Sequence, residues 1–395
     1  MWFELLEHSD TEDPNWIQEL IEDKLSFHGA MRVLSDHGLV EVEKPSLELV
    51  ESQGYSIHGC VHSWTVHVLN QEWNYDLARV AVNCIALHVP GEQANRPWLT
   101  QRRLLQHAAR CSHIVLNGLV TDDGMAGAYF SLGYLFNDQG KLVEAEQMYQ
   151  RVLQGYEKAW GPEHTSTLGT VNNLGLLYKN QGKLVEAEQM YQRALQGYQK
   201  AWGPEHTSTL DTVNNLGLLY ADQGKLVEAE QMYQRALQGK EKAWGPEHTS
   251  TLATVNNLGL LYADQGKLVE AEQIYQRALQ GYEKAIGADG ITTYIPALNT
   301  IQNLGSLFEL QADFAKARIM YSKALAGYKA VGPNHPRCQT LEEFLQDLHT
   351  RTKTEAIKGT KEPESNHLGE VSRSDSKGAP STSRRHKLFK KLGLR

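Results

Sequence analysis

Pairs of asparagines recur at a fixed spacing in this chain, as Asn172–Asn173, Asn214–Asn215 and Asn256–Asn257. A carboxamide carries both a hydrogen-bond donor and an acceptor, so it can pair with the backbone of an extended peptide whatever the peptide's side chains. We expect the second asparagine of each pair to hydrogen-bond neighbouring helices, and the first asparagine is the candidate for pairing with such a backbone. The first asparagines are Asn172, Asn214 and Asn256.

The histidines and acidic residues form no recognisable catalytic or metal-binding arrangement. His164, His206 and His248 repeat at the same spacing as the asparagines. Equivalent residues of packed helices lie about 10 Å apart, whereas Zn–N bonds are about 2.0–2.1 Å, so we expect these histidines to shape the turns before helices. No set of nucleophile, base and orienting residue can be assembled. The sequence therefore predicts a protein that is not an enzyme, with no catalytic residue, metal or cofactor.

These residues belong to a repeat of 42 residues, whose near-identical copies begin at Lys141, Lys183 and Lys225. A diverged fourth copy begins at Lys267, and a half-copy with the sequence AYFSLGYLFNDQG precedes the first. A period of this length indicates stacked supersecondary units rather than one closed core. The predicted fold class is therefore mainly α, an α-solenoid.

Each repeat contains two helical patterns separated by a glycine. Leu168, Val171, Leu174 and Tyr178 follow the spacing of one helix face and define a helix A. Gly182 suits the left-handed conformation that ends this helix. We expect the hydroxyl of Thr165 or Ser166 to cap the start of helix A.

The second pattern, helix B, runs from Leu184 to Trp202 and ends at Gly203–Pro204, because proline cannot continue a helix. Its apolar stripe includes a tryptophan in every near-copy. We predict that these tryptophans belong to the core; they are Trp160, Trp202 and Trp244.

The run N-L-G-x-x-Y, followed by Gly182, Ala187, Tyr191 and Ala194, resembles the tetratricopeptide (TPR) motif. The usual unit has about 34 residues, and the longer unit here resembles the repeats of kinesin light chains and of fungal NLR-like NB-ARC proteins. The resemblance covers residues 126–348, with copies starting near residues 126, 168, 210, 252 and 298. It implies a superhelix whose concave wall, made mainly of A helices, binds a protein or an extended peptide.

Six of the 42 repeat positions differ among the three near-copies, and three of the six lie on helix A. On the TPR template these three positions face the groove or its edge, so we interpret the groove as the part that varies. The alternative is that they are the solvent-tolerant positions of recently duplicated DNA. Together with the first asparagines, the predicted groove residues are Gly169, Asp211, Ala253, Lys179, Asn180, Asp222 and Asp264. Because their charged members are three aspartates and one lysine, we expect a basic or neutral peptide rather than an acidic one.

Composition and charge restrict the classes of protein to which this chain can belong. The chain has 395 residues, a net charge of −8 and four cysteines without CxxC spacing, which favours neither a zinc site nor a disulfide framework. We find no signal peptide and no apolar run of membrane-spanning length, so a cytoplasmic location is expected. Residues 1–60 hold thirteen acidic and three basic side chains, which disfavours nucleic-acid binding. The oligomeric state is left open.

Residues 1–72 are predicted to form a small winged-helix-like module, followed by a helical spacer at residues 73–125. The segment Tyr55–Val61 resembles the MHD-type segment of the NB-ARC winged helix, in which a histidine contacts the phosphates of a bound nucleotide. That role would carry over to His58 only if a nucleotide-binding domain were present. No GxxxxGK[ST] phosphate loop occurs in this sequence. We therefore interpret His58 as structural and expect no binding of ATP or GTP.

Residues 349–395 are predicted to be a disordered basic tail, because they hold too little apolar surface to offset the entropy of ordering. Residues 351–395 contain twelve basic and five acidic side chains. The final run SRRHKLFKKLGLR combines six basic residues with the apolar Leu388, Phe389, Leu392 and Leu394. We favour a solvated tail, and the alternatives are docking on an anionic membrane or partner, or nuclear import.

The leading hypothesis is a non-enzymatic interaction scaffold, the ligand-sensing TPR part of a fungal NLR-like protein that acts in self/non-self recognition. One alternative is an incomplete copy of a nucleotide-regulated STAND-type ATPase switch. The other is a cargo adaptor similar to a kinesin light chain, which the lack of heptads able to pair with a motor disfavours.

Overall fold

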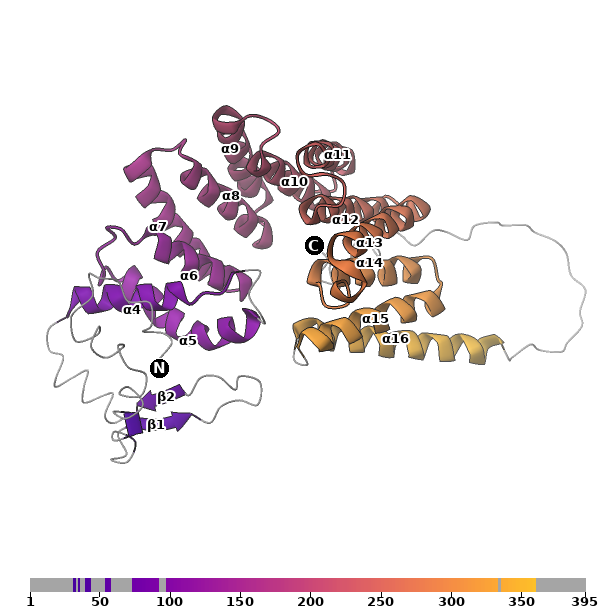
Figure 1. Cartoon of the computed structure of the whole chain (residues 1–395), viewed down its shortest axis with the longest axis horizontal. Helices are drawn as coiled ribbons and strands as arrows, with labels where there is room; N and C mark the ends of the chain where they lie inside the picture. Colours follow the sequence, from indigo (N-terminus) through magenta and orange to yellow (C-terminus); the bar gives the residue numbers. More distant parts are fainter. Residues whose placement is uncertain are drawn as a thin grey trace, which may run out of the picture. The chain divides into compact units, whose positions relative to one another are not determined.

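The computed structural model describes residues 31–32, 35, 40–43, 54–57, 73–91, 97–332 and 335–359 (Figure 1). These residues are mainly helical, as the repeat predicts. Near the N-terminus two short strands, β1 (Val40–Glu43) and β2 (Gly54–Ile57), pair antiparallel with Val40 opposite Ile57. Most of the predicted winged-helix-like module, His58 included, lies outside the described residues.

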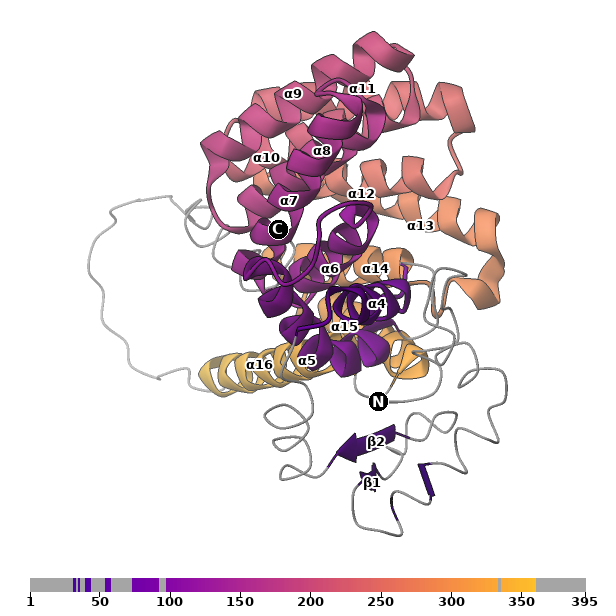
Figure 2. The same ribbon diagram turned by 90° about the vertical axis from the view of Figure 1, so that its left-hand side faces the viewer.

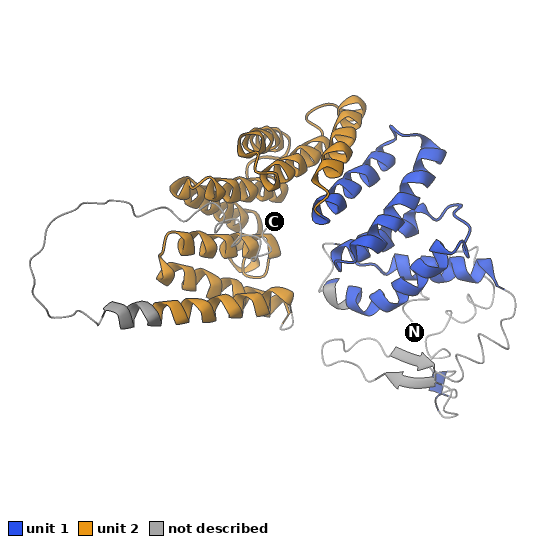
Figure 3. Cartoon of the chain, turned by 180° about the vertical axis from the view of Figure 1, so that it is seen from behind, with its two compact units in different colours: residues 1–181 blue, residues 182–395 orange. Residues whose placement is uncertain are grey.

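The chain divides into two compact units, residues 1–181 and 182–395 (Figure 3). In unit 1 the helices are α4 (Tyr75–Leu87), α5 (Pro97–Leu116), α6 (Ala126–Asp138), α7 (Leu142–Trp160) and α8 (Thr165–Asn180). Within this unit α6 packs on α7, and α7 packs on α8. The first A helix of unit 1 is thus α6, which begins at Ala126.

Unit 2 contains eight further helices in the described residues. They are α9 (Leu184–Trp202), α10 (Thr207–Asp222), α11 (Leu226–Trp244), α12 (Thr249–Asp264), α13 (Leu268–Gly290), α14 (Ile295–Leu310), α15 (Phe314–Val331) and α16 (Pro336–Gly359). Consecutive helices pack together from α9 to α16, and Figures 1 and 2 show α14, α15 and α16 side by side. From α6 to α15 the even-numbered helices are the A helices and the odd-numbered helices are the B helices.

Helices A and B of one repeat meet where a glycine faces a buried tyrosine. A Cβ atom placed on Gly217 of α10 would lie 2.8 Å from ring carbons of Tyr233 on α11. The same contact joins Gly259 to Tyr275 in the next repeat. These tyrosine rings are at most 1% exposed, so each fills the space that a glycine leaves and brings the two helices close together.

Histidines cap the A helices α8, α10 and α12, which corrects the expectation that Thr165 or Ser166 caps helix A. His164 precedes α8, and its Nδ1 atom accepts a hydrogen bond from the backbone N–H of Ser166 at 3.3 Å. His206 and His248 cap α10 and α12 in the same way. The threonine three residues after each of these caps is also engaged, since Thr209 Oγ1 donates to the carbonyl of Gly203 at 2.9 Å.

The tryptophans are more exposed than predicted, because helix B ends at the edge of the stack rather than in the core. Trp160 is 53% exposed and Trp202 is 43% exposed, while Trp244 is partly buried. Each packs on the capping histidine that follows it, and the Trp202 and His206 ring centroids lie 4.1 Å apart. The prediction that they are core residues was wrong.

A glutamate of each B helix links one repeat to the next. Glu188 on α9 accepts hydrogen bonds from Tyr220 at 3.2 Å and from Gln223 at 3.0 Å, both on or beside α10, and forms an ion pair with Lys225. Glu230 on α11 makes the equivalent contacts with Tyr262, Gln265 and Lys267. These contacts fix the position of successive hairpins within unit 2.

The glycine contact predicts the effect of adding one methyl group. Gly217→Ala should lower the free energy of unfolding by about 1–3 kcal/mol, since the new Cβ atom overpacks against Tyr233. Gly155→Ala on α7 is the matched control, because its Cβ atom would meet nothing closer than 3.8 Å, and it should raise stability by about 0.5–1 kcal/mol. Urea unfolding monitored by circular dichroism measures both, and equal effects would contradict the contact.

The glutamate contacts predict a loss of stability in acid. The pKa of Glu188 lies below its ordinary value of 4.5 because Gln223 hydrogen-bonds its carboxylate. Burial acts to raise the pKa of Glu230, but hydrogen bonds from Gln265 and Lys267 outweigh it and lower that pKa as well. A carboxyl whose pKa is lowered by folding stabilises the fold above its unfolded pKa, and this contribution disappears as the pH falls through the folded pKa.

The free energy of unfolding should therefore decline as the pH drops below about 4.5. In the double variant Glu188→Gln, Glu230→Gln, this decline should be shallower, because neither amide takes up a proton. Urea unfolding between pH 6 and pH 3 tests the expectation. A decline of unchanged steepness in the variant would show that these glutamates do not contribute to it.

Candidate functional site

One stripe of each A helix in unit 2 lies next to the face that packs on helix B of the same repeat. On α10 it holds Asp211, Asn214, Leu218 and Asp222, which lie within about 80° of one another at 100° per residue and beside the core face that includes Gly217. The equivalent residues of α12 are Ala253, Asn256, Leu260 and Asp264, and those of α14 are Asn299, Gln302, Ser306 and Leu310. We call this surface the A face of unit 2.

Asparagine amides connect the A helices across this face. Asn257 Nδ2 on α12 donates to Asn214 Oδ1 on α10 at 3.2 Å. Asn256 Oδ1 accepts two hydrogen bonds from α14, one from Thr300 Oγ1 at 3.1 Å and one from Asn303 Nδ2 at 3.0 Å. Of the second asparagines, Asn257 therefore bonds between helices as expected, and its partner is the oxygen of a first asparagine, Asn214.

These contacts fix the orientation of the first asparagines. Since the oxygen atoms of Asn214 and Asn256 are engaged by neighbouring helices, each Nδ2 group must point the other way. Both side chains are half-buried, and within the described residues neither Nδ2 group donates a hydrogen bond. Asn214 on α10 and Asn256 on α12 thus each present an N–H donor in a fixed direction, on neighbouring A helices.

A hollow lies between α10 and α12, with Asn257 in its wall. It is shallow, with room for about one water molecule, and its wall includes Leu218 and Leu260 together with Tyr233. Two predicted groove residues, Asp222 and Asp264, also line it. Apolar contact and negative charge thus occur together at this point of the A face.

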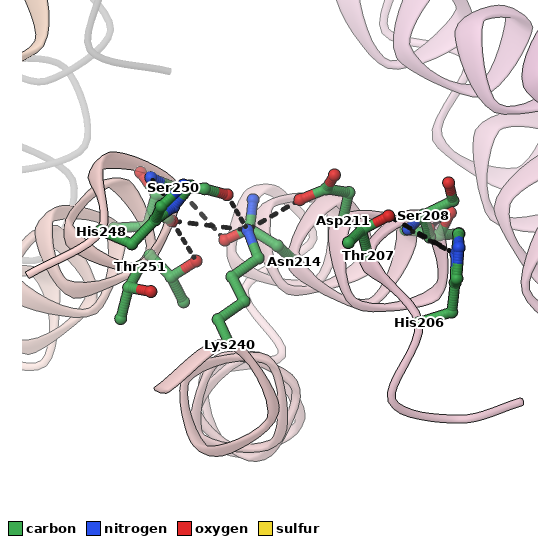
Figure 4. Close-up of polar contacts among 12 residues, drawn as sticks. His206, Thr207, Ser208, Asp211, Asn214, Lys240, His248, Ser250 and Thr251 are labelled. Atoms are coloured by element: carbon green, nitrogen blue, oxygen red, sulfur yellow. Dashed lines mark hydrogen bonds and ion pairs between the residues drawn. The ribbon is translucent and has the colours of Figure 1, made fainter. Parts of the chain in front are cut away.

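Lys240 adds a feature that was not predicted as part of the site. It lies on α11, it is 3% exposed, and its ammonium group points between α10 and α12 (Figure 4). There it forms an ion pair with Asp211 at 2.8 Å and donates to Ser250 Oγ at 3.0 Å. Its signal in the sequence was the replacement, by lysine, of the tyrosine found at residues 156 and 198.

The predicted groove residues of unit 1 all lie on α8. Asn172, Gly169 and Lys179 are partly buried, and Asn180 is exposed. Asn180 Nδ2 donates to Asn137 Oδ1 on α6 at 3.4 Å, so polar contacts join the A helices here too. The A face of unit 2 provides the more complete set of amides and carboxylates.

Other chemistries find no support in the described part of the chain. No group of three or more His, Cys, Asp or Glu residues there is placed to hold a metal ion. The described cysteines Cys84, Cys111 and Cys338 are free and buried, and burial raises the pKa of the Cys111 thiol to about 12. No described helix is both long and apolar enough to cross a bilayer.

A tetratricopeptide-repeat family model matches residues 124–200, 166–242, 208–284 and 250–330, a span of more than half the chain. No curated protein matches this sequence.

Three solved structures are similar. BtubC (BKLC) from P. vanneervenii is 19% identical with a TM-score of 0.43, over 76% of this chain and 99% of that one. A putative kinesin light chain with nearly identical TPR-like repeats from Podosopora anserina is 20% identical with a TM-score of 0.41, over 52% of this chain and 93% of that one. A Rap protein in complex with competence and sporulation factor is 12% identical with a TM-score of 0.43, over 74% of this chain and 80% of that one.

The contact between Lys240 and Asp211 predicts an energetic coupling. Asp211→Ala alone should destabilise the chain by about 1–2 kcal/mol, because it removes the anion beside a buried ammonium group. In the background Lys240→Tyr, which restores the residue found at position 198, the same change should cost less than about 0.5 kcal/mol. A double-mutant cycle from urea unfolding measures the difference, and additive effects would show that the pair is not coupled.

Proposed function

The chain belongs to the tetratricopeptide-repeat family, and from this premise we propose that it is a non-enzymatic scaffold that binds an extended peptide across the A face of unit 2. The observation that carries the proposal is the orientation of Asn214 and Asn256, whose oxygens are engaged between helices and whose Nδ2 groups remain as donors. Such donors pair with backbone carbonyls, which every peptide presents.

The charges of the A face support a basic or neutral peptide. Asp222 and Asp264 line the hollow between α10 and α12, whereas the ammonium group of Lys240 is already paired with Asp211. A peptide with apolar and basic side chains would place the former against Leu218, which is partly exposed, and the latter near the carboxylates. The interaction should therefore weaken with rising salt.

We further propose that peptide binding is the sensing step of an NLR-like protein. The support is the resemblance of Tyr55–Val61 to the NB-ARC winged helix, together with the 42-residue form of the repeat. The test is the genomic DNA directly upstream of this coding sequence. An in-frame phosphate loop there supports a receptor that contains this chain, and its absence argues against that context.

The asparagine donors predict a loss of peptide binding on truncation. The immobilised full chain should enrich peptides from a displayed random library, and fluorescence anisotropy should then give the affinity of one selected peptide. The double variant Asn214→Ala, Asn256→Ala should bind that peptide about 5–30-fold more weakly, the effect of losing two hydrogen bonds of about 0.5–1 kcal/mol each.

A matched control removes the same chemical group from the B helices. Gln231 and Gln273 are exposed on α11 and α13, so Gln231→Ala, Gln273→Ala should leave the affinity unchanged. Equal losses in both double variants, or no loss in the asparagine variant, would contradict the proposed role of the A face. Failure to enrich any peptide would count against peptide binding itself.

A further inference from the structure

We propose that residues 13–27 of this chain bind the exposed side of α4 in unit 1 as an amphipathic helix. The inference goes beyond the proposed function and concerns a different unit of the chain from the A face. It is carried by the apolar composition of α4, by the exposure of its leucines, and by the sequence pattern and charge of residues 13–27.

Helix α4 is apolar on all sides. Ten of its thirteen residues are apolar, and the other three are Asp76, Arg79 and Asn83. A helix of this composition is normally buried all round. Within the described residues α4 packs on α5 and α6 (Figures 1 and 2). These two helices leave one side of α4 exposed, and its composition favours a partner there.

The exposed side carries large apolar side chains. Leu77, Val80 and Leu87 lie within about 80° of one another at 100° per residue. Leu77 is 36% exposed, Leu87 is 61% exposed, and Trp73 just before the helix is 46% exposed. The indole N–H of Trp73 donates to the carbonyl of Leu119 at 2.7 Å, which holds the ring near the start of the helix. We call Trp73, Leu77, Val80 and Leu87 the α4 stripe.

The α4 stripe runs beside α5. Cys84 falls between Val80 and Leu87 at helical spacing, but it is buried. The Sγ atom of Cys111 on α5 lies 3.9 Å from the carbonyl oxygen of Ala81, so α5 borders the stripe. The sequence of α5 contains three arginines and no acidic residue. A segment that covers the α4 stripe therefore meets positive charge at this border.

Residues 13–27, with the sequence DPNWIQELIEDKLSF, match this surface in pattern and in charge. The large apolar residues fall on one half of a helix at 100° per residue; they are Trp16, Ile17, Leu20, Ile21, Leu25 and Phe27. Three of the four acidic residues fall on the other half; they are Glu19, Glu22 and Asp23. Such a helix can cover the apolar stripe while its carboxylates approach the arginines of α5.

The connecting residues allow this contact within one molecule. Residues 28–72 separate the segment from Trp73, and these 45 residues span at most roughly 150 Å. Helix α4 is only about 20 Å long at 1.5 Å per residue. The whole α4 stripe is therefore within reach, and the tether raises the effective concentration of the segment to about the millimolar range.

Hydrogen exchange of the full chain tests the contact. The backbone amides of residues 15–27 should exchange at least about tenfold more slowly than those of the same sequence as an isolated peptide, because docking protects their hydrogen bonds. The double variant Leu77→Gln, Leu87→Gln should remove most of this protection. Exchange at the isolated-peptide rate in the unchanged chain, or protection that survives in the variant, would overturn the proposal.

A matched control changes two exposed apolar residues elsewhere. Val227 on α11 and Val269 on α13 are 66% and 65% exposed, so Val227→Gln, Val269→Gln should leave the protection of residues 15–27 unchanged. Circular dichroism should show the same helix content in both double variants, since all four positions are on the surface. Equal loss of protection in the two variants would contradict a contact specific to α4.

Thiol labelling tests the contact from the other side. In the full chain with Leu87→Cys and Cys60→Ser, the introduced thiol should react with a maleimide at least about fivefold faster once Leu20→Gln, Ile21→Gln is added, because the segment no longer covers it. The described cysteines are buried, so they add little background. Leu5→Gln, Leu6→Gln, which lies outside the segment, should not change the rate. Equal rates in all three proteins would sink the proposal.

A second copy of the chain gives a distinct result. Protection of residues 15–27 that is lost on dilution would place the segment on α4 of another molecule and contradict binding within one chain. Protection that is independent of concentration supports the proposal. None of these variants changes the A face, so the proposed peptide binding stands or fails separately.

Discussion

The contact between a glycine of helix A and a buried tyrosine of helix B determines how the rest of each repeat is arranged. Gly217 leaves room for the ring of Tyr233, which would otherwise lie 2.8 Å from a Cβ atom. This close approach fixes the rotation of helix A about its axis. Asp211, Asn214, Leu218 and Asp222 consequently lie beside the core face of helix A, and the A face exists because that contact repeats.

The packing of successive repeats then determines which polar atoms of the A face are available to a peptide. Glu188 and Glu230 hold successive hairpins in place through tyrosine, glutamine and lysine partners. In that arrangement the oxygens of Asn214 and Asn256 meet donors from the next A helix. A repeated residue that could turn either end of its amide outward is thereby made to present the donor end, which suits it to backbone carbonyls.

The helices, their glycine ends and the start of each repeat could be predicted from the sequence, because periodicity and turn residues are local signals. The capping role of His206 could not, since serine and threonine beside it are the commoner caps and the choice depends on backbone geometry. Trp202 matched the apolar stripe, but its helix extends beyond the neighbours that would cover it. The burial of Lys240 depended on Asp211 and Ser250, whose proximity no spacing rule predicts. Whether Asn172, Asn214 and Asn256 bind a peptide stays a prediction.

The side-chain amide signals of the asparagines test the central claim most directly. In a ¹H–¹⁵N spectrum of the full chain labelled at asparagine, the Nδ2 signals of Asn214 and Asn256 can be identified by their loss in single Asn→Ala variants. Adding a peptide selected from the displayed library should shift these two signals and leave that of Asn257, which donates to Asn214, largely in place. Unchanged signals of Asn214 and Asn256 at saturating peptide would contradict the proposed role of these donors.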